Sequence, residues 1–269
     1  RVMDVQAPYR RRSYPWRLGA TSFVIPADLL ANVRRLAGLV DDVQLLFFES
    51  RAKSGLPHPV DVAALKGMAD AAGLTYTVHL PADIRLGAAS ADERRAGVVE
   101  IVRLLDELAP LAVQGYDLHL PAEPGINEEE WLANLDWSLA LLAARVGAER
   151  SRICIENVDY PLALVAPRVE AHGFSFCLDV GHLLRYGHDW RAEVEKYLPQ
   201  ARHLHYHGVI AGKDHQAVVK EQAEVSKALG ELLARHCFGG VVTLEMYEFI
   251  KLEASLLELA SAWEGYARE

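Results

Sequence analysis

The sequence has no run of eighteen or more apolar residues, and this absence argues against a membrane-spanning helix. Its first segment, RVMDVQAPYRRRSYPW, is basic but lacks the apolar stretch of a secretory signal. Cysteine is scarce as well: Cys154, Cys177 and Cys237 all fall in apolar segments. This small, odd number predicts reduced, buried thiols in a cytoplasmic protein and argues against a disulfide framework.

Positive charge is also in short supply. The 28 Lys and Arg residues are outnumbered by 37 Asp and Glu residues, which gives a net charge of −9. Nucleic-acid binders concentrate positive charge, because phosphate contacts supply most of their non-specific affinity. We therefore expect no nucleic-acid partner and no membrane partner. The basic run from Arg10 to Arg12 is interpreted as part of a solvated tail over residues 1–15, which precedes a single domain over residues 16–269.

The sequence instead shows a repeated alternation of short β-forming runs with stretches of helical spacing. The β-rich runs occur at residues 17–24, 42–48, 74–80, 115–120, 152–156, 174–180, 203–207 and 241–246. Ser90 and Asn127 are predicted N-caps of two intervening helices, and a later helix is expected over residues 217–237.

Strands joined in this way are expected to be parallel, because each return to the sheet needs a helical crossover. Eight strand–helix units in 269 residues predict an α/β protein with a single (β/α)8 TIM barrel. The alternative is a doubly wound open sheet, which would carry a glycine-rich phosphate turn after the first strand. The corresponding segment, LGATSFVIPAD, has no such turn.

Titratable side chains stand where the predicted strands end. The phrases TVHLPAD and DLHLPAE place His79 and His119 at the ends of the third and fourth strands. The other candidates are Glu49 after the second strand, Glu156, Asp179 with His182 three residues later, the histidines of HLHYHG (His203, His205 and His207), Asp214 and His215 in GKDH, and Glu245. Because the strands of a TIM barrel carry the active site at their C-terminal ends, these groups are expected to meet at one mouth.

Imidazoles and carboxylates are the groups that divalent cations bind in proteins. Each of these residues alone is more typical of a hydrogen-bonded rim residue or a helix cap. Gathered at one mouth, they would repel one another and resist burial unless positive charge were also present. The joint pattern therefore predicts a metal site, with a metal-free polar cleft as the alternative.

This set of residues resembles the pattern of the xylose-isomerase-like TIM-barrel superfamily, which includes sugar isomerases, sugar epimerases and endonuclease IV-type phosphodiesterases. The resemblance covers nearly the whole chain. It implies a core metal held by Glu156, Asp179, His205 and Glu245, with His207 as the alternative to His205. The phosphodiesterase branch would add His79, His119, His182 and an Asp-x-His in the seventh loop. Here Asp214 and His215 are adjacent, so this loop departs from the spacing of that branch.

Two segments, LGATSFVIPADLLANVRRLAGLVDDVQLLFFES and HLHYHGVIAGKDH, are similar to the cobamide-remodelling phosphodiesterases, bacterial enzymes of this superfamily. That similarity implies a corrinoid substrate. It also implies hydrolysis of the cobamide nucleotide loop between phosphate and ribose, which leaves cobinamide phosphate and a nucleoside. Two or three divalent ions, zinc or manganese, would be held by His79, His119, Glu156, Asp179, His182, His205, Asp214 and Glu245.

In this scheme Glu156 bridges two ions, and Glu156 and Glu245 take part in catalysis through metal-bound water. Additional ligands or ligand supports would come from His207, His215 and Glu49. The substrate phosphate would be steadied by Lys213 or Arg185.

Three other functions are compatible with the same residues. In a sugar isomerase or epimerase, Glu156 and Glu245 would shuttle protons beside a single metal. A repair nuclease would need a basic face, which a net charge of −9 makes hard to assemble. A corrinoid- or sugar-binding barrel would bind its ligand without turnover. The number of bound ions separates hydrolysis, with two or three, from proton transfer, with one.

Overall fold

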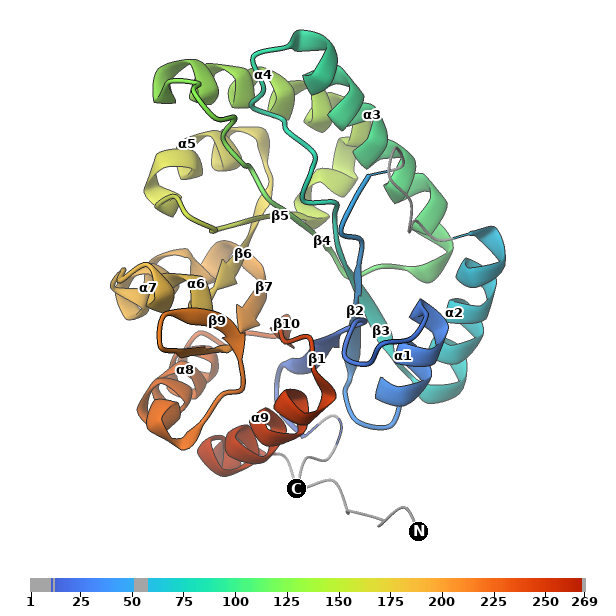
Figure 1. The fold of residues 1–269 in the computed structure, drawn as a ribbon, viewed down its shortest axis with the longest axis vertical. Helices are drawn as coiled ribbons and strands as arrows, with labels where there is room; N and C mark the ends of the chain where they lie inside the picture. The colour runs from blue at the N-terminus through green and yellow to red at the C-terminus, as the bar shows by residue number, and fades with distance from the viewer. Residues whose placement is uncertain (1–10, 12, 51–57, 268–269) are drawn as a thin grey trace.

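The computed structural model describes residue 11, residues 13–50 and residues 58–267. Eight parallel strands close into a barrel in the order β1-β10-β7-β6-β5-β4-β3-β2, and the helices lie outside it (Figure 1). β1 closes the ring by pairing with both β2 and β10. The predicted single (β/α)8 barrel is thus confirmed. None of the helices in the described ranges is both long and apolar enough to cross a bilayer.

The barrel strands match the eight predicted runs. They are β1 (Arg17–Thr21), β2 (Asp42–Leu46), β3 (Thr75–His79), β4 (Tyr116–Leu118), β5 (Ile153–Glu156), β6 (Ser175–Asp179), β7 (Ala201–Tyr206) and β10 (Val241–Leu244). Every strand except β5 leaves the ladder before the predicted run ends, because the chain turns there into the loops of the barrel mouth. The titratable residues at these ends are consequently placed at the rim.

The helices are α1 (Leu29–Leu36), α2 (Pro59–Ala72), α3 (Ala91–Leu108), α4 (Glu128–Val146), α5 (Leu162–His172), α6 (Val180–Arg185), α7 (Trp190–Tyr197), α8 (Ala223–Arg235) and α9 (Phe249–Ala262). Both predicted N-caps are confirmed, since the side chains of Ser90 and Asn127 accept hydrogen bonds from backbone amides of the first turn. α8 is shorter than the helix predicted over residues 217–237, because a 3-10 turn at Lys220–Gln222 precedes it.

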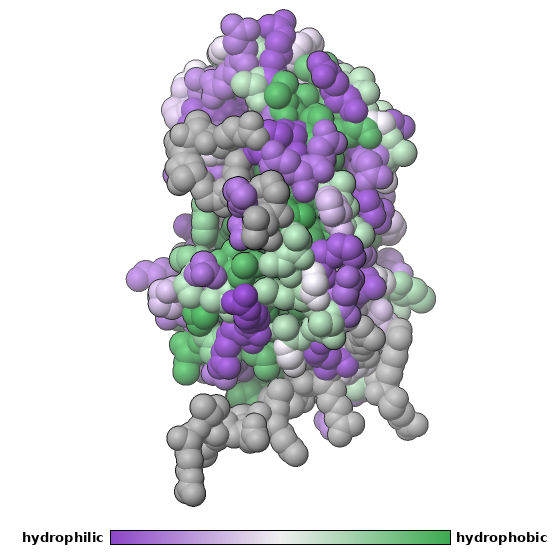
Figure 2. Space-filling view, turned by 90° about the vertical axis from the view of Figure 1, so that its right-hand side faces the viewer, coloured by the Kyte–Doolittle hydropathy of each residue, from purple (hydrophilic) through white to green (hydrophobic). Residues whose placement is uncertain are grey.

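The helices turn their apolar stripes toward the barrel. In α3, for example, Val98, Ile101 and Leu105 are buried, as the spacing of apolar residues indicates. On the side of the molecule formed by α2 and α3, hydrophilic side chains cover much of the surface and apolar side chains show between them (Figure 2).

Aromatic packing closes the N-terminal end of the barrel. Trp16 and Trp263 meet edge to face with ring centroids 5.2 Å apart, and Tyr14 stacks on Trp16 at 5.4 Å. The guanidinium of Arg11 donates hydrogen bonds to three backbone carbonyls at the C-terminal ends of α1 and α2, where the helix dipoles favour positive charge. In its described part, the segment predicted to be a solvated tail is therefore packed on the barrel.

The rest of that basic run, Arg10 and Arg12, is outside the described residues. Of the cysteines, Cys154 and Cys177 are buried as predicted, whereas Cys237 is exposed. Cys237 follows α8 in a left-handed turn (φ 51°) at the surface, so the prediction that its thiol is buried is wrong.

Candidate metal centre

Three adjacent strands and the residue after β10 bring four potential ligands together, which we call the central group: Glu156, Asp179, His205 and Glu245. Glu156 ends β5, Asp179 ends β6, and His205 lies beside Asp179 in β7. One ligand atom from each residue lies within 4.8 Å of the others, and all four side chains are buried. His205 Nδ1 is 3.4 Å from Glu156 Oε2 and 3.5 Å from Glu245 Oε2.

Atoms of the central group that face one another have no hydrogen-bond partner among the described residues. These buried atoms are both carboxylate oxygens of Glu156, Oδ2 of Asp179, Oε2 of Glu245 and Nδ1 of His205. A buried polar atom without a partner costs about 1–3 kcal/mol, so five such atoms around one point need an explanation. Carboxylate oxygens and an imidazole nitrogen are the donors that divalent cations bind in proteins, so these four residues fit such an ion.

The ionisation of the central group also indicates a demand for positive charge. Burial alone raises the pKa of Glu156, but nearby His205 and His119 outweigh it and hold that pKa well below its usual value. Conversely, burial lowers the pKa of His205, yet the carboxylates of Glu156 and Glu245 outweigh it and raise that pKa well above its usual value. A divalent cation, when bound, supplies the charge that a proton on His205 otherwise supplies.

A second group of potential ligands shares Glu156 with the first. His79 ends β3, and His119 follows β4. The Nε2 atoms of the two rings are 3.2 Å apart, and they lie 3.6 Å and 3.3 Å from Glu156 Oε2. His79 Nδ1 is 2.8 Å from the Leu80 carbonyl, to which it can only donate, and this leaves the lone pair of the ring on Nε2, toward Glu156. The repeated His-Leu-Pro-Ala phrase therefore forms two neighbouring walls of one site.

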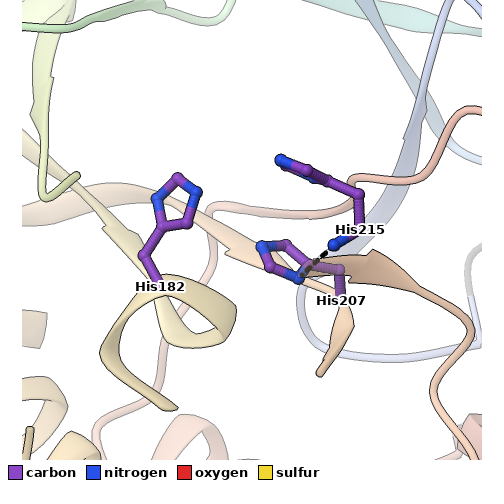
Figure 3. A group of neighbouring side chains, drawn as sticks. All are labelled: His182, His207 and His215. Carbon is purple, nitrogen blue, oxygen red and sulfur yellow. Dashed lines mark hydrogen bonds between the residues drawn. The ribbon is translucent and has the colours of Figure 1, made fainter. Parts of the chain in front are cut away.

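The third group consists of His182, His207 and His215, whose rings face one another in Figure 3. His182 lies in α6, and His207 directly follows β7. His215 belongs to a hairpin of β8 (Gly208–Ile210) and β9 (Lys213–Gln216), which is antiparallel and separate from the barrel sheet. The sequence predicts a loop for Asp214 and His215 and gives no sign of the hairpin. His182 Nδ1 is 3.1 Å from Asp179 Oδ2, which connects this group to the central one.

His207 contacts the hairpin through one ring nitrogen and faces Asp179 with the other. Its Nδ1 accepts a hydrogen bond from the backbone amide of His215 at 3.0 Å, and its Nε2 lies 3.3 Å from Asp179 Oδ1. The ring therefore supports the hairpin, and its Nε2 has no hydrogen-bond partner among the described residues. Of the two histidines considered for the core ligand set, the structure places His205 in the central group and His207 beside it.

The remaining predicted site residues divide into two that reach the mouth and two that do not. Asp214 lies 4.0 Å from His182 Nε2 and forms an ion pair with Arg185, and both line a cavity of about 240 Å³ above the central group. Glu49 and Lys213 are exposed and are not among the described residues that line this cavity. β2 ends at Leu46, so Glu49 is already three residues into the loop, which is why its predicted role as a ligand or support finds no basis here.

The sequence reading missed a layer of polar residues beneath the central group. Asp117 of β4 is fully buried, and its Oδ2 lies 3.3 Å from His205 Nε2 and accepts a hydrogen bond from Gln44 Nε2 at 2.8 Å. Its Oδ1 is 2.7 Å from His203 Nδ1. Asp117 stands two residues before His119, and alternation along a strand puts the two side chains on one face, so a signal for it was present.

Two cysteines join this lower layer as hydrogen-bonding or packing partners. Asp117 lies close to Cys154 and His203, and also to Cys177 and His205. Burial raises the pKa of both thiols, which keeps them protonated. A protonated thiol is a poor metal ligand, and the 2.7 Å contact between Asp117 and His203 is an ordinary hydrogen bond. In this layer His203 Nε2 and Gln44 Oε1 also lack a hydrogen-bond partner among the described residues, but of the two layers only the central group has carboxylate oxygens without one.

Comparison with solved structures finds the same fold in proteins of several activities. A D-tagatose 3-epimerase-like protein has a TM-score of 0.79 at 18% identity, with 93% of this chain and 98% of that chain covered. The 3-keto-D-glucoside 4-epimerase from E. coli has a TM-score of 0.70 at 17% identity, covering 92% and 98%. An AP endonuclease of family 2 from Brucella melitensis has a TM-score of 0.71 at 15% identity, covering 91% and 98%. At these identities the likeness shows the fold alone.

Among curated proteins, none matches the chain. The sequence profile of one family does match, over residues 33–263, which is most of the chain. That family is described as xylose isomerase-like TIM barrel, and it agrees with the resemblance carried by the strand-end residues. The chain therefore belongs to the xylose isomerase-like TIM-barrel family.

Proposed function

We propose that the protein is a metal-dependent enzyme acting at the barrel mouth, and that hydrolysis of a phosphodiester is the reaction its donor set supports best. The observation that carries this proposal is the position of Glu156, which belongs both to the central group and to the group with His79 and His119. The third group adjoins the central one through Asp179. Three adjoining sets of donors suit a centre with more than one cation.

Divalent cations, when bound, lower the pKa of water and stabilise the charged oxygens of a phosphoryl group. Residues of this chain would hold the cations and orient the substrate. Glu156 and Glu245 provide carboxylates on the cavity wall, and His79 and His119 provide imidazoles opposite them. Arg185, which lines the same cavity and pairs with Asp214, is placed to contact a substrate phosphate.

The second candidate is a sugar isomerase or epimerase, and the similar structures favour it over hydrolysis. Two of those named above are epimerases or resemble one, by their printed descriptions. In this alternative the central group holds a single metal, and Glu156 and Glu245 move a proton to and from a substrate carbon. The extra imidazoles of His79 and His119 would then bind substrate hydroxyls.

The narrower substrate, a cobamide, rests on the two sequence segments that resemble cobamide-remodelling phosphodiesterases. A corrinoid partner, a cytoplasmic location and the absence of nucleic-acid and membrane partners belong to the same proposal.

One experiment separates the candidates. The purified protein is analysed for bound metal, then incubated with bis-p-nitrophenyl phosphate, with a cobamide and with D-tagatose and D-fructose. The proposal predicts two or three ions per chain, release of nitrophenol and a spectral change of the cobamide. One ion per chain with epimerised ketose would establish the alternative.

Variants of two glutamates complete the test. Glu156→Gln should abolish turnover, because it replaces the carboxylate shared by two groups with a neutral amide. Glu149→Gln, at a glutamate that is 55% exposed, should leave turnover unchanged. Turnover that survives in Glu156→Gln contradicts the assignment of this centre.

A further inference from the structure

The barrel mouth carries exposed aromatic side chains that are not part of the metal centre. Phe23, in the loop after β1, is 42% exposed, and Phe48, after β2, is 50% exposed. Clustered apolar area in contact with water marks a binding surface more often than it marks chance. With Tyr247, which follows β10, these residues form what we call the aromatic shelf (Phe23, Phe48 and Tyr247).

The rings of the shelf make a row that ends at the ligand groups. Phe23 and Phe48 meet edge to face with centroids 5.4 Å apart, and Phe48 and Tyr247 lie 6.3 Å apart. Tyr247 then contacts the ring of His215 at 4.9 Å, and its hydroxyl lies 3.5 Å from Glu245 Oε1. Phe48 and Tyr247 also line the cavity above the central group. When the anionic group of a molecule lies in the cavity, the part of the molecule attached to that group therefore lies beside the shelf.

Buried hydrogen bonds hold the shelf in place. Asn32 is fully buried, and its Oδ1 accepts hydrogen bonds from the amides of Val24 and Ile25, directly after Phe23. The Ser22 hydroxyl accepts from the Leu46 amide at 2.9 Å, which ties the segment of Phe23 to that of Phe48. The exposure of the two rings is therefore a property of the fold, and a preorganised surface of this kind loses little entropy on binding.

We propose that the aromatic shelf binds a flat, conjugated ring of the substrate while the phosphoryl group of the same molecule lies at the metal centre. This inference rests on the proposed phosphodiesterase function and assigns the residues that would recognise a ring system of its substrate. Aromatic rings pair favourably at centroid distances of about 4.5–7 Å, the spacing found within the shelf. A free ketose carries a hydroxyl group on most of its carbons and offers no conjugated ring to pair with Phe23 and Phe48.

The test compares a phosphonate that carries a flat conjugated ring with one that carries only a methyl group. Binding of methylphosphonate and of naphthylphosphonate to the manganese-loaded protein is measured by calorimetry, which requires no turnover. The naphthyl compound should bind more tightly, and Phe48→Ala should reduce this preference by about threefold to tenfold. Phe23→Ala should reduce it less, because Phe23 is farther along the row from the cavity. Trp137→Ala removes a ring that is 39% exposed on α4 and serves as the matched control.

The outcomes distinguish failure of the shelf proposal from failure of the proposed phosphodiesterase function. A naphthyl preference that falls in the shelf variants and persists in Trp137→Ala supports the shelf. A preference unchanged by Phe48→Ala, a preference equally reduced by Trp137→Ala, or a protein that binds neither phosphonate overturns it. Failure of the proposed function has a different signature: the ring preference is present, but no phosphodiester is hydrolysed. Both phenylalanines are exposed, so their replacement leaves the core intact, and a melting curve of each variant verifies this.

Discussion

Binding of a divalent cation should stabilise the fold strongly, and the size of the effect follows from the central group. Five buried atoms of Glu156, Asp179, His205 and Glu245 have no hydrogen-bond partner among the described residues. Each unpaired atom costs about 1–3 kcal/mol in the protein without metal, and a proton on His205 relieves only part of this cost, so a bound cation should stabilise the folded state. The folded state alone has this arrangement, so the metal binds it in preference to the unfolded chain.

The measurable effect is limited by mass action. A cation present at a thousand times its dissociation constant stabilises the native state by about 4 kcal/mol. For a chain of this size each kcal/mol corresponds to about 2–4 °C, so the melting temperature should rise by roughly 8–16 °C. The assay is a thermal melt of chelator-treated protein with and without added manganese or zinc.

Two variants make this measurement specific. Glu156→Gln replaces the carboxylate shared by two ligand groups with a neutral amide and should lose most of the rise. Glu149→Gln alters an exposed ion pair with Arg152 and should keep the rise. A rise of the same size in Glu156→Gln would mean that the metal binds elsewhere. No rise with either cation would refute the reasoning from the unpaired atoms.

Three further predictions concern pH, a loop and a helix contact. Carboxylates raise the pKa of His205 against the effect of burial, so the metal-free protein keeps this proton to higher pH than the unfolded chain does. A cation must displace the proton, so titration calorimetry should show the affinity for manganese rising with pH up to that raised pKa. An affinity independent of pH would contradict the assignment. Asn32→Ala should lower the free energy of unfolding by about 3 kcal/mol, because it leaves the amides of Val24 and Ile25 in the first loop unpaired. Asn127→Ala, at an exposed N-cap, should lower it by about 1 kcal/mol. Equal urea midpoints of the two variants would count against this. Gly230→Ala should destabilise by about 1–3 kcal/mol, since a Cβ there would lie 2.7 Å from the Trp263 ring, and an unchanged melting temperature would show that the ring moves freely.

The strand-end residues were predictable because one geometric rule applies to all of them. Parallel strands in a barrel align their C-terminal ends, so Glu156, Asp179 and the histidines of the repeated phrase had to lie on one rim once eight strand–helix units were recognised. Only backbone periodicity and the order of elements enter that inference. Pairing distances and side-chain rotamers do not.

What the sequence did not reveal depends on contacts between distant segments. The hydrogen bond of Gln44 to Asp117 joins β2 to β4 across the inside of the barrel. Arg11 was predicted to lie in a solvated tail, but it packs on the barrel because its guanidinium can donate hydrogen bonds to carbonyls at the ends of α1 and α2. Glu49 appeared equivalent to the other strand-end carboxylates until the end of β2 was known. Each of these depends on register or loop length, which local patterns do not fix.

The β8–β9 hairpin has a consequence for how this scaffold changes its chemistry over evolution. It supplies Asp214 and His215 to the mouth, yet it pairs with itself and shares no ladder with the barrel. Under the proposed multi-ion centre, insertion, loss or reshaping of this hairpin would change the set of potential ligands at the mouth while the strand pairing of the barrel stays as it is. Changes confined to such a hairpin would offer a short mutational route between barrels that bind one ion and barrels that bind several.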